Sequence, residues 1–220
     1  MIKNILKIEK FDLLVSVYIF CILISEVMGA KTFPIATLFN YSLNASVGIF
    51  VLPLIFTIND IITEVFGKER TRSVIRSGLI MIILLLAFSV LATNLPPSTR
   101  FQATEPAYKL IFGLSIRFSI ASLIAFTMAE FLDVFVYVKL RKRFGASKLW
   151  LRNNVSNIIS QFVDTTTFMI LAFYSLDKPF SSNAIFISGL ILPYWLLKCS
   201  MSVIETPFVY LGVKWLKKTE

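Results

Sequence analysis

Charged side chains interrupt several long apolar segments of this 220-residue chain. A charge at the centre of a bilayer costs about 2.5–3.5 kcal/mol on insertion scales. We therefore expect these side chains to face one another or a water-filled cavity, where carboxylates can accept and basic groups can donate hydrogen bonds. The seven residues are Glu26, Asp60, Arg117, Glu130, Asp164, Lys198 and Glu205.

Other polar residues accompany these charges at helical spacing. The stripes, which repeat about every three or four residues, are Thr57, Asp60 and Glu64; Ser119, Ser122, Phe126, Glu130 and Asp133; Asn153, Asn157, Ser160, Gln161 and Asp164; and Tyr194, Lys198, Ser202 and Glu205. Such spacing places each set on one helix face. For the serines alone, interhelical hydrogen bonds explain the pattern, and Asp133 has an ion pair with Lys139 as an alternative. The remaining acids favour a functional site.

Six apolar segments are long enough to carry these stripes across a membrane, which takes about 20 helical residues. They cover residues 11–29, 46–66, 74–93, 112–138, 150–174 and 184–211. Apolar residues make up 56% of the chain and charged residues 16%, against about 25% charged in soluble domains. The sequence predicts an all-α integral membrane protein, with residues 1–220 forming one domain of six transmembrane helices.

The predicted cavity lies between the second, fourth, fifth and sixth spans, which carry the stripes. The third span has almost no polar residue at depth, so we expect it at the periphery. Two longer outer connections, 30–45 and 94–111, contain prolines and are too short for an extramembrane domain.

The basic residues alternate in number between successive connections, which predicts the orientation. Sixteen lie at the termini and in the second and fourth connections: Lys3, Lys7, Lys10, Lys68, Arg70, Arg72, Arg76, Lys139, Arg141, Lys142, Arg143, Lys148, Arg152, Lys214, Lys217 and Lys218. Four lie on the other side: Lys31, Arg100, Lys109 and Lys178. The positive-inside rule then places both termini in the cytoplasm. The net charge of +9 thus reflects topology and contact with anionic lipid, not binding of nucleic acid.

Several kinds of chemistry have no support in the sequence. Histidine is absent, which removes catalytic triads and histidine-ligated metal centres, and no cofactor is expected. Cys21 and Cys199 lie in apolar segments as small fillers. A membrane enzyme is an alternative with little to support it, because neither a D-x-x-D metal pair nor a G-x-S-x-G elbow occurs.

A weak internal repeat relates the two halves. Glu26 and Glu130 are 104 residues apart, as are Asp60 and Asp164. Because three spans separate the members of each pair, this spacing is compatible with a 3+3 inverted repeat of the kind found in many transporters. Identity along the offset is otherwise low, so the repeat and a simple bundle both stay open.

The motifs resemble one family across nearly the whole chain. They are Asp60-x-x-Thr63-Glu64-x-x-Gly67 with Arg72, Arg117 through Ser122 to Glu130, Trp150-x-Arg152 with Ser156, Gln161 and Asp164, and Lys198 with Glu205 and Pro207. This order resembles the queuosine precursor transporters, also called the vitamin uptake transporter family. The chain departs from the family pattern at Glu26, where Asn is common, which leaves the choice of substrate open.

The resemblance implies a bacterial inner-membrane importer of 7-deazaguanines: 7-cyano-7-deazaguanine, 7-aminomethyl-7-deazaguanine or queuine. The expected binding residues are Glu26, Asp60, Arg117, Glu130, Asn157, Gln161, Asp164 and Lys198. A carboxylate, with Glu130 or Asp164 favoured, would accept from the ring N–H and the exocyclic amine. A donor from Lys198, Arg117 or Gln161 would bind the ring carbonyl. In the structural alternative, Asp164 only neutralises Lys198 or Arg117.

Aromatic side chains near the stripes would cover the flat ring: Phe126, Phe131, Phe162 and Tyr194. The favoured mode is a secondary transporter that needs no partner. The alternative is a substrate-binding membrane subunit for a vitamin or nucleobase that requires a separate ATPase module, since the chain has no Walker A motif. The sequence leaves the oligomeric state and the coupling ion open.

Overall fold

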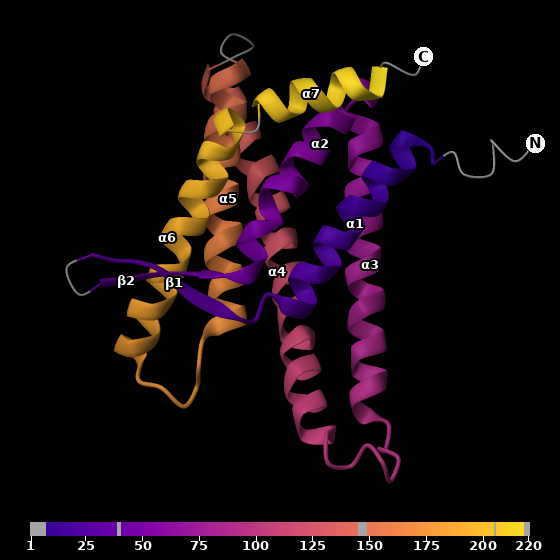
Figure 1. Cartoon of the computed structure of the whole chain (residues 1–220). Coiled ribbons are helices and arrows are strands. Elements are labelled where there is room, and N and C mark those ends of the chain that lie inside the picture. Colours follow the sequence, from indigo (N-terminus) through magenta and orange to yellow (C-terminus); the bar gives the residue numbers. More distant parts are fainter. Residues whose placement is uncertain (1–7, 39–40, 145–148, 205, 218–220) are drawn as a thin grey trace, which may run out of the picture.

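Helices form most of the chain (Figure 1). The computed structural model describes residues 8–38, 41–144, 149–204 and 206–217, and for some residues within these ranges only the backbone. The helices are α1 (Lys10–Met28), α2 (Leu52–Phe66), α3 (Lys68–Asn94), α4 (Glu105–Phe144), α5 (Leu149–Phe173), α6 (Phe180–Ile204) and α7 (Thr206–Lys217). A short 3-10 helix, η2 (Val47–Phe50), follows strands β1 (Thr32–Leu38) and β2 (Tyr41–Ser46).

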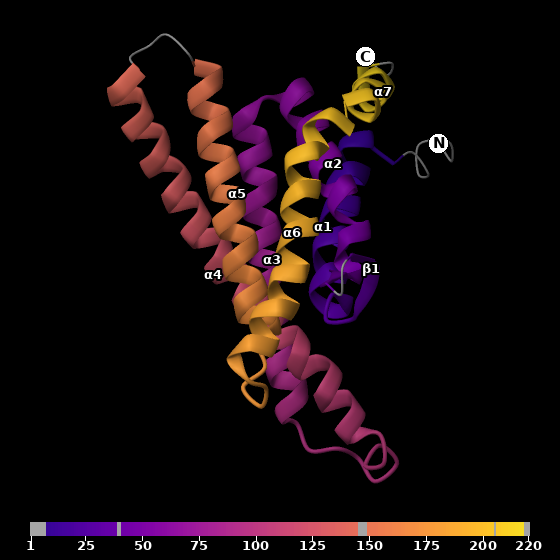
Figure 2. The ribbon, with the colours of Figure 1, turned by 90° about the vertical axis from the view of Figure 1, so that its left-hand side faces the viewer.

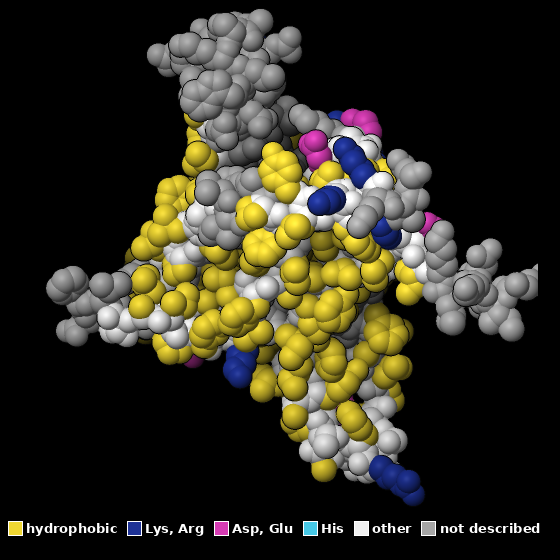
Figure 3. All heavy atoms as spheres, turned by 45° about the horizontal axis from the view of Figure 1, so that its top comes forward, with side chains coloured by type: hydrophobic (Ala, Val, Ile, Leu, Met, Phe, Trp, Pro, Cys, Tyr) yellow, Lys and Arg dark blue, Asp and Glu magenta, His cyan; other side chains and the backbone are white. Residues whose placement is uncertain are grey.

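The described part of the chain contains five segments that are long and apolar enough to cross a membrane. They lie in α1, in η2 with α2, in α3, in the first part of α4, and in α6; α5 adds a shorter apolar helix at Ile158–Phe173. Apolar side chains cover much of the surface, with Lys and Arg towards its ends (Figure 3). Since a water-soluble protein rarely exposes so large an apolar patch, these features confirm a mainly helical, multi-pass membrane protein.

The two ends of the bundle differ in charge as the sequence predicts. In Figure 1 the start of α1, the α2–α3 junction, the end of α4 and α7 lie at the upper end. The connections from α3 to α4 and from α5 to α6 lie at the lower end. The segments rich in Lys and Arg therefore share one end, while the cytoplasmic location of that end stays a prediction.

Gly67 makes the sharp reversal between α2 and α3 possible. It is the single residue between the two helices, and its φ of 81° lies in the left-handed region. Glycine reaches this region without the steric cost that a Cβ atom brings. The reversal lets the Thr63 and Thr71 hydroxyl groups form a 2.8 Å hydrogen bond across the turn.

Strands β1 and β2 form a β-hairpin within the outer connection predicted at 30–45, a secondary structure that the sequence analysis did not predict. Strands β1 and β2 pair in antiparallel register from Thr32 opposite Ser46 to Leu38 opposite Tyr41, with a shift between Pro34 and Ala36. Threonine, phenylalanine and isoleucine in β1 favour extended backbone. The hairpin packs against α6 through β2, so this connection belongs to the folded body.

The predicted sixth span, 184–211, is wrong at both ends. Helix α6 begins at Phe180 and ends at Ile204, and a separate helix, α7, follows. Pro207 explains the break, because proline within a helix removes a backbone hydrogen bond and clashes with the preceding turn, whereas the first turn of a new helix tolerates it. Figure 1 shows α7 crossing the upper end of the bundle. Helices α4 and α5 pack side by side within the bundle (Figure 2).

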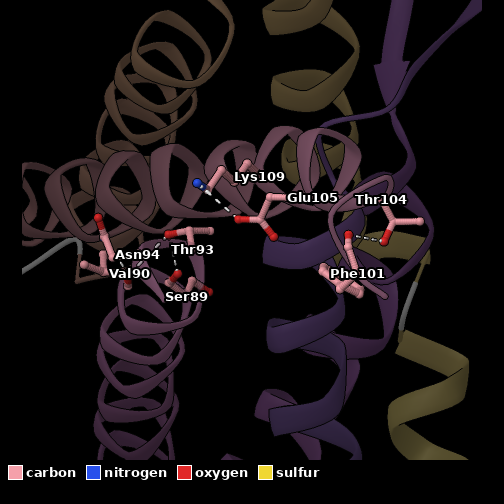
Figure 4. Close-up of polar contacts among 8 residues, drawn as sticks. All are labelled: Ser89, Val90, Thr93, Asn94, Phe101, Thr104, Glu105 and Lys109. Carbon is pink, nitrogen blue, oxygen red and sulfur yellow. Dashed lines mark hydrogen bonds and ion pairs between the residues drawn. The ribbon is translucent and has the colours of Figure 1, made fainter. Parts of the chain in front are cut away.

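The outer turn between α3 and α4 is closed by local polar contacts (Figure 4). Thr93 donates to the carbonyl oxygen of Ser89 and Asn94 to that of Val90, each at 2.8 Å. These side-chain bonds add a second donor to carbonyl groups that the last turns of α3 already pair with backbone N–H groups. Glu105 in the first turn of α4 pairs with Lys109 at 3.1 Å. Helix α4 has 40 residues, about 60 Å at 1.5 Å per residue, so it extends beyond a bilayer core of about 30 Å.

Candidate functional site

A cavity of about 260 Å³ lies among the helices. Its lining comes from α1, α3, α4, α5 and α6, and from the segment at the end of β2 through η2 to the start of α2. This volume falls near the lower limit of small-molecule pockets, about 300–1,000 Å³. Two carboxylates, Glu26 and Asp164, and one amine, Lys198, line it together with mostly apolar side chains.

Glu26 is the buried carboxylate of this cavity. It lies near the end of α1 and is only 6% exposed. Ser122 of α4 donates a 2.6 Å hydrogen bond to its Oε1 atom. The buried Ser119 hydroxyl interacts with the same carboxyl group, but neither it nor Glu26 Oε2 has a hydrogen bond of normal geometry within the described part of the chain. A buried acceptor without a donor is costly, so Oε2 is ready to accept from a ligand.

Asp164 and Lys198 form an ion pair on another wall of the cavity. Lys198 Nζ of α6 donates to Asp164 Oδ2 of α5 at 2.7 Å, with side-chain exposures of 12% and 30% respectively. The pair cancels two charges at bilayer depth, which is the structural alternative expected for Asp164. An ammonium group has three donors, so Lys198 still has hydrogen-bonding capacity for a ligand.

The segment around Ser46 forms a wall of the cavity, and three hydrogen bonds hold it in place. Ser46 Oγ donates to the Gly29 carbonyl oxygen at 2.5 Å and accepts from the Gly48 backbone N–H at 3.1 Å. Tyr194 of α6 donates to the Ser46 carbonyl oxygen at 3.0 Å. These bonds join the end of α1, the hairpin and α6, so the hairpin positions the wall.

Aromatic rings make up much of the remaining lining. Tyr18, Phe118, Phe126, Phe168 and Tyr194 come from four helices. Phe118 and Phe168 meet edge to face, with ring centroids 5.5 Å apart. A flat apolar ligand could therefore be enclosed by rings while its polar edge meets a carboxylate.

Sequence comparison identifies the family. Residues 46–212 match the sequence model described as "Putative vitamin uptake transporter". The chain belongs to this family. Its members are transporters, which agrees with the prediction that the chain is not an enzyme and confirms the resemblance inferred from the motifs. The match covers every cavity-lining element except α1, so the segment that carries Glu26 lies outside it.

Curated relatives carry more specific names. The transporter is 30% identical to a "Probable queuosine precursor transporter" of Bacillus subtilis over 82% of this chain and 76% of the relative. It is 28% identical to a protein of the same name from Haemophilus influenzae, over 66% and 58%. Identity to the "Queuosine precursor transporter" of Escherichia coli is also 28%, over 62% and 58%. No solved structure matches the chain.

Arg117 lies outside the cavity lining of this transporter. Its Nε donates to the Leu171 carbonyl oxygen at 2.7 Å and its NH2 nitrogen to the Tyr174 carbonyl oxygen at 2.5 Å. These acceptors lie at the end of α5, where helix carbonyls lack internal partners and carry partial negative charge. The observed contacts are structural, between α4 and α5.

The other predicted binding residues are distributed differently. Asp60 is exposed on α2, and Gln161 is half-buried on α5; neither lines the cavity. The side chains of Glu130 and Asn157, with those of Asp133, Asn153, Ser202 and Glu205, lie outside the described residues. The roles of Glu130 and Asn157 therefore stay predictions.

Two expectations about the cavity walls require correction. The third span was expected at the periphery, but α3 contributes Ile75, Leu79 and Ile82 to the lining. The polar stripe of the second span is not part of it, since α2 contributes only Leu52. Helix α2 instead buries Ile58 and Ile62 against α1 and α3, which directs the polar face that carries Asp60 elsewhere.

Sequence reasoning missed some lining residues because it selected mainly polar residues at helical spacing. Phe118 lies one turn before Ser122, and Phe168 one turn after Asp164, so helical spacing from those residues would have found both. Phe131 and Phe162, which were expected to cover a ring, are instead 76% and 44% exposed. Ser46 and Gly48 had no such signal, because β2 and η2 do not follow the helical period. Among the described residues, no cluster of three or more acidic or cysteine side chains could hold a metal ion.

Proposed function

We propose that this transporter imports queuosine precursors, 7-deazaguanines, across the bacterial cytoplasmic membrane, and that the cavity is their binding site. The observation that carries the proposal is the buried Glu26 carboxylate, whose Oε2 atom has no hydrogen bond of normal geometry among the described residues. The names of the relatives from three bacteria support the same substrate class.

The chemistry of a 7-deazaguanine suits this carboxylate. Its base edge presents a ring N–H beside an exocyclic amine, and a carboxylate can accept from both through charge-assisted bonds. Ser122 already donates to Oε1, which leaves lone pairs on both oxygens. This proposal moves the main contact from Glu130 or Asp164, the acids favoured by sequence, to Glu26.

The ion pair and the aromatic walls complete the proposed site. Lys198 would donate to the ring carbonyl oxygen while keeping its bond to Asp164. Asp164 Oδ1 would accept from a cationic aminomethyl group, if the ligand carries one. Phe118, Phe126 and Phe168 would pack against the faces and edges of the ring.

Binding measurements on the purified transporter test the substrate and the site together. We expect the unchanged chain to bind at least one of the three deazaguanines in a titration and to prefer it over adenine, which lacks the paired N–H and amine edge. Glu26→Gln should weaken binding strongly, whereas the matched control Glu69→Gln, at an exposed position on α3, should bind normally. Failure of all three ligands to bind would end the substrate proposal.

The mode of transport needs a second experiment. We propose a secondary transporter that works without an ATPase module. Proteoliposomes that contain only this chain should take up the ligand that binds in the titration, faster than vesicles with Glu26→Gln. Binding without uptake, restored by added membrane ATPase components, would instead favour the substrate-binding subunit.

We also propose that both termini face the cytoplasm and that α5 crosses the membrane as a sixth span. In a variant without Cys21 and Cys199, a cysteine at position 99 should react with an impermeant thiol reagent outside intact cells. A cysteine at position 142 should react only after lysis. Labelling of position 142 in intact cells would reverse the topology.

A further proposal is that α1–α3 and α4–α6 are related as an inverted repeat. The 104-residue offset supports it, as does a cavity whose walls come from both halves. The halves are not equivalent, since Asp164 lines the cavity and Asp60 does not. Superposition of α1–α3 on α4–α6 would test the relation, and unlike helix arrangements would contradict it.

A further inference from the structure

Helix α7 lies at the end of the bundle where Lys and Arg gather. It begins at Thr206, does not continue the direction of α6, and crosses over α2 (Figures 1 and 2). With 12 residues it is about 18 Å long, which is too short to span a bilayer. Helix α7 must therefore lie along a surface, and the side chains on its faces indicate which one.

One face of α7 packs on the protein. Leu216 is 8% exposed, and a Cβ atom at Gly212 would overlap the Ile61 side chain of α2. The absence of a side chain at Gly212 allows α7 to lie directly on α2. The end of the helix is also held: Lys10 of α1 donates to the Trp215 carbonyl oxygen, and its Nζ atom lies 4.9 Å from the centre of the Trp215 ring.

The second face is apolar and exposed. Phe208, Leu211 and Trp215 are spaced i, i+3 and i+7, which places them in one stripe along the helix. They are 60%, 66% and 41% exposed respectively. A stripe of this kind beside a protein-facing side is unfavourable in water but suits the boundary between acyl chains and headgroups.

The third face carries the charge. At 100° per residue, Tyr210, Lys214 and Lys217 lie on the side opposite the packed face, next to the apolar stripe. The lysines occupy the last turn of the helix. Arg70, Arg72 and Arg76 are exposed near the same end of the bundle. An aromatic and apolar stripe next to a basic face is the pattern of helices that lie in a membrane surface.

We propose that α7 lies in the headgroup layer of the membrane and, with its lysines, forms a binding site for anionic phospholipids. The stripe of Phe208, Leu211 and Trp215 enters the acyl-chain boundary, while Lys214 and Lys217 bind phosphate groups. A second copy of the chain is a poorer occupant, because its own basic end would face this one and repel it. The inference does not depend on the transported substrate.

Quenching of Trp215 by brominated lipids tests the site in the full-length protein. The Trp215 signal is the difference between the unchanged chain and Trp215→Phe, reconstituted in bilayers of phosphatidylcholine and phosphatidylglycerol. Bromine on the upper acyl carbons should quench it more strongly than bromine near the chain ends. At equal lipid fractions, brominated phosphatidylglycerol should quench more than brominated phosphatidylcholine.

Variants that remove the charge of Lys214 and Lys217 test whether these lysines bind the anionic lipid. Lys214→Gln/Lys217→Gln should lower the preference for phosphatidylglycerol by about fivefold per lysine, roughly the effect of one basic residue at an anionic surface. The matched control Arg100→Gln/Lys178→Gln, at the opposite end, should leave the preference unchanged. Should the lysine variant fail to fold, the comparison of the two lipids on the unchanged chain still decides.

Three results would overturn the proposal. The first is a Trp215 signal that neither lipid quenches, because α7 would then lie outside the membrane. The second is equal quenching by both lipids in the unchanged chain, which would remove the anionic site. The third is a protein of twice the mass of one chain in which lipid does not quench Trp215. The apolar stripe would then contact a second copy of the chain.

Discussion

Glu26 and Asp164 are carboxylates that line the same cavity, yet their surroundings differ. Asp164 on α5 has a lysine at 2.7 Å and keeps 30% of its side chain exposed. Glu26 on α1 is 6% exposed, and Ser122 donates to its Oε1 atom. Its Oε2 atom has no hydrogen bond of normal geometry among the described residues, although the Ser119 hydroxyl interacts with the same carboxyl group. A paired charge at bilayer depth is already compensated, whereas an unpaired one keeps its affinity for a ligand's donors. The comparison supports the proposal that Asp164 has a mainly electrostatic, structural role and that Glu26 recognises the ligand.

The largest expected effect follows from Glu26→Gln. The amide keeps the size of the side chain but replaces one acceptor with a donor that faces the donors of the ligand. Loss of a buried charged contact costs about 2–5 kcal/mol, so the dissociation constant for the deazaguanine should rise about 30-fold or more. Titration calorimetry measures it. Unchanged affinity, with Asp164→Asn abolishing binding, would exchange the roles of the two acids.

The ion pair should matter more for stability than for recognition. Lys198→Met leaves Asp164 without its cation, and removing one partner of a fully buried pair costs about 3–5 kcal/mol. Partial exposure of Asp164 reduces this to about 1–3 kcal/mol. The apparent Tm of the detergent-solubilised protein should fall, and Asp164→Asn/Lys198→Met should recover most of the loss. A single variant with the Tm of the unchanged chain would show that the pair adds no stability.

A smaller effect is expected at Ser122, which orients Glu26. Ser122→Ala removes the donor to Oε1 from both the free and the bound protein, so the change in binding is only the cost of a less ordered carboxylate. We expect affinity to fall roughly threefold to tenfold, near the net value of one hydrogen bond. Ser122→Thr retains the hydroxyl and should bind nearly normally. Equal binding by the Ala variant and the unchanged chain would mean that Glu26 needs no positioning.

The smallest effect on binding is expected at Arg117, which holds the end of α5. Arg117→Lys keeps the charge but supports only one of the two carbonyl contacts, so unfolding should require about 1 kcal/mol less. Deazaguanine affinity of the folded protein should not change. Thermal denaturation and titration of one sample separate the two quantities. A selective loss of affinity would return Arg117 to the binding site.

Local pattern was enough to find several features of this protein. Long apolar segments and their flanking charges predicted the membrane class, because the cost of burying polar groups in lipid leaves few alternatives. Helical spacing predicted that Ser122, Asp164, Tyr194 and Lys198 face inward. Local pattern did not predict the hairpin of β1 and β2 within the outer connection, and it did not separate α7 from the end of the sixth span.

What the sequence alone determined is which residues are expensive to place in a membrane: Glu26, Asp164 and Lys198 are evident from composition and spacing. Only the tertiary structure decided which of them pair. Asp164 and Lys198 lie 34 residues apart on different helices, and Ser122 meets Glu26 across 96 residues. Such contacts depend on how α1, α4, α5 and α6 pack, and spacing along a single helix carries no information about the rotation of one helix against another. That rotation pairs Lys198 with Asp164 and places Glu26 against two serine hydroxyl groups of α4.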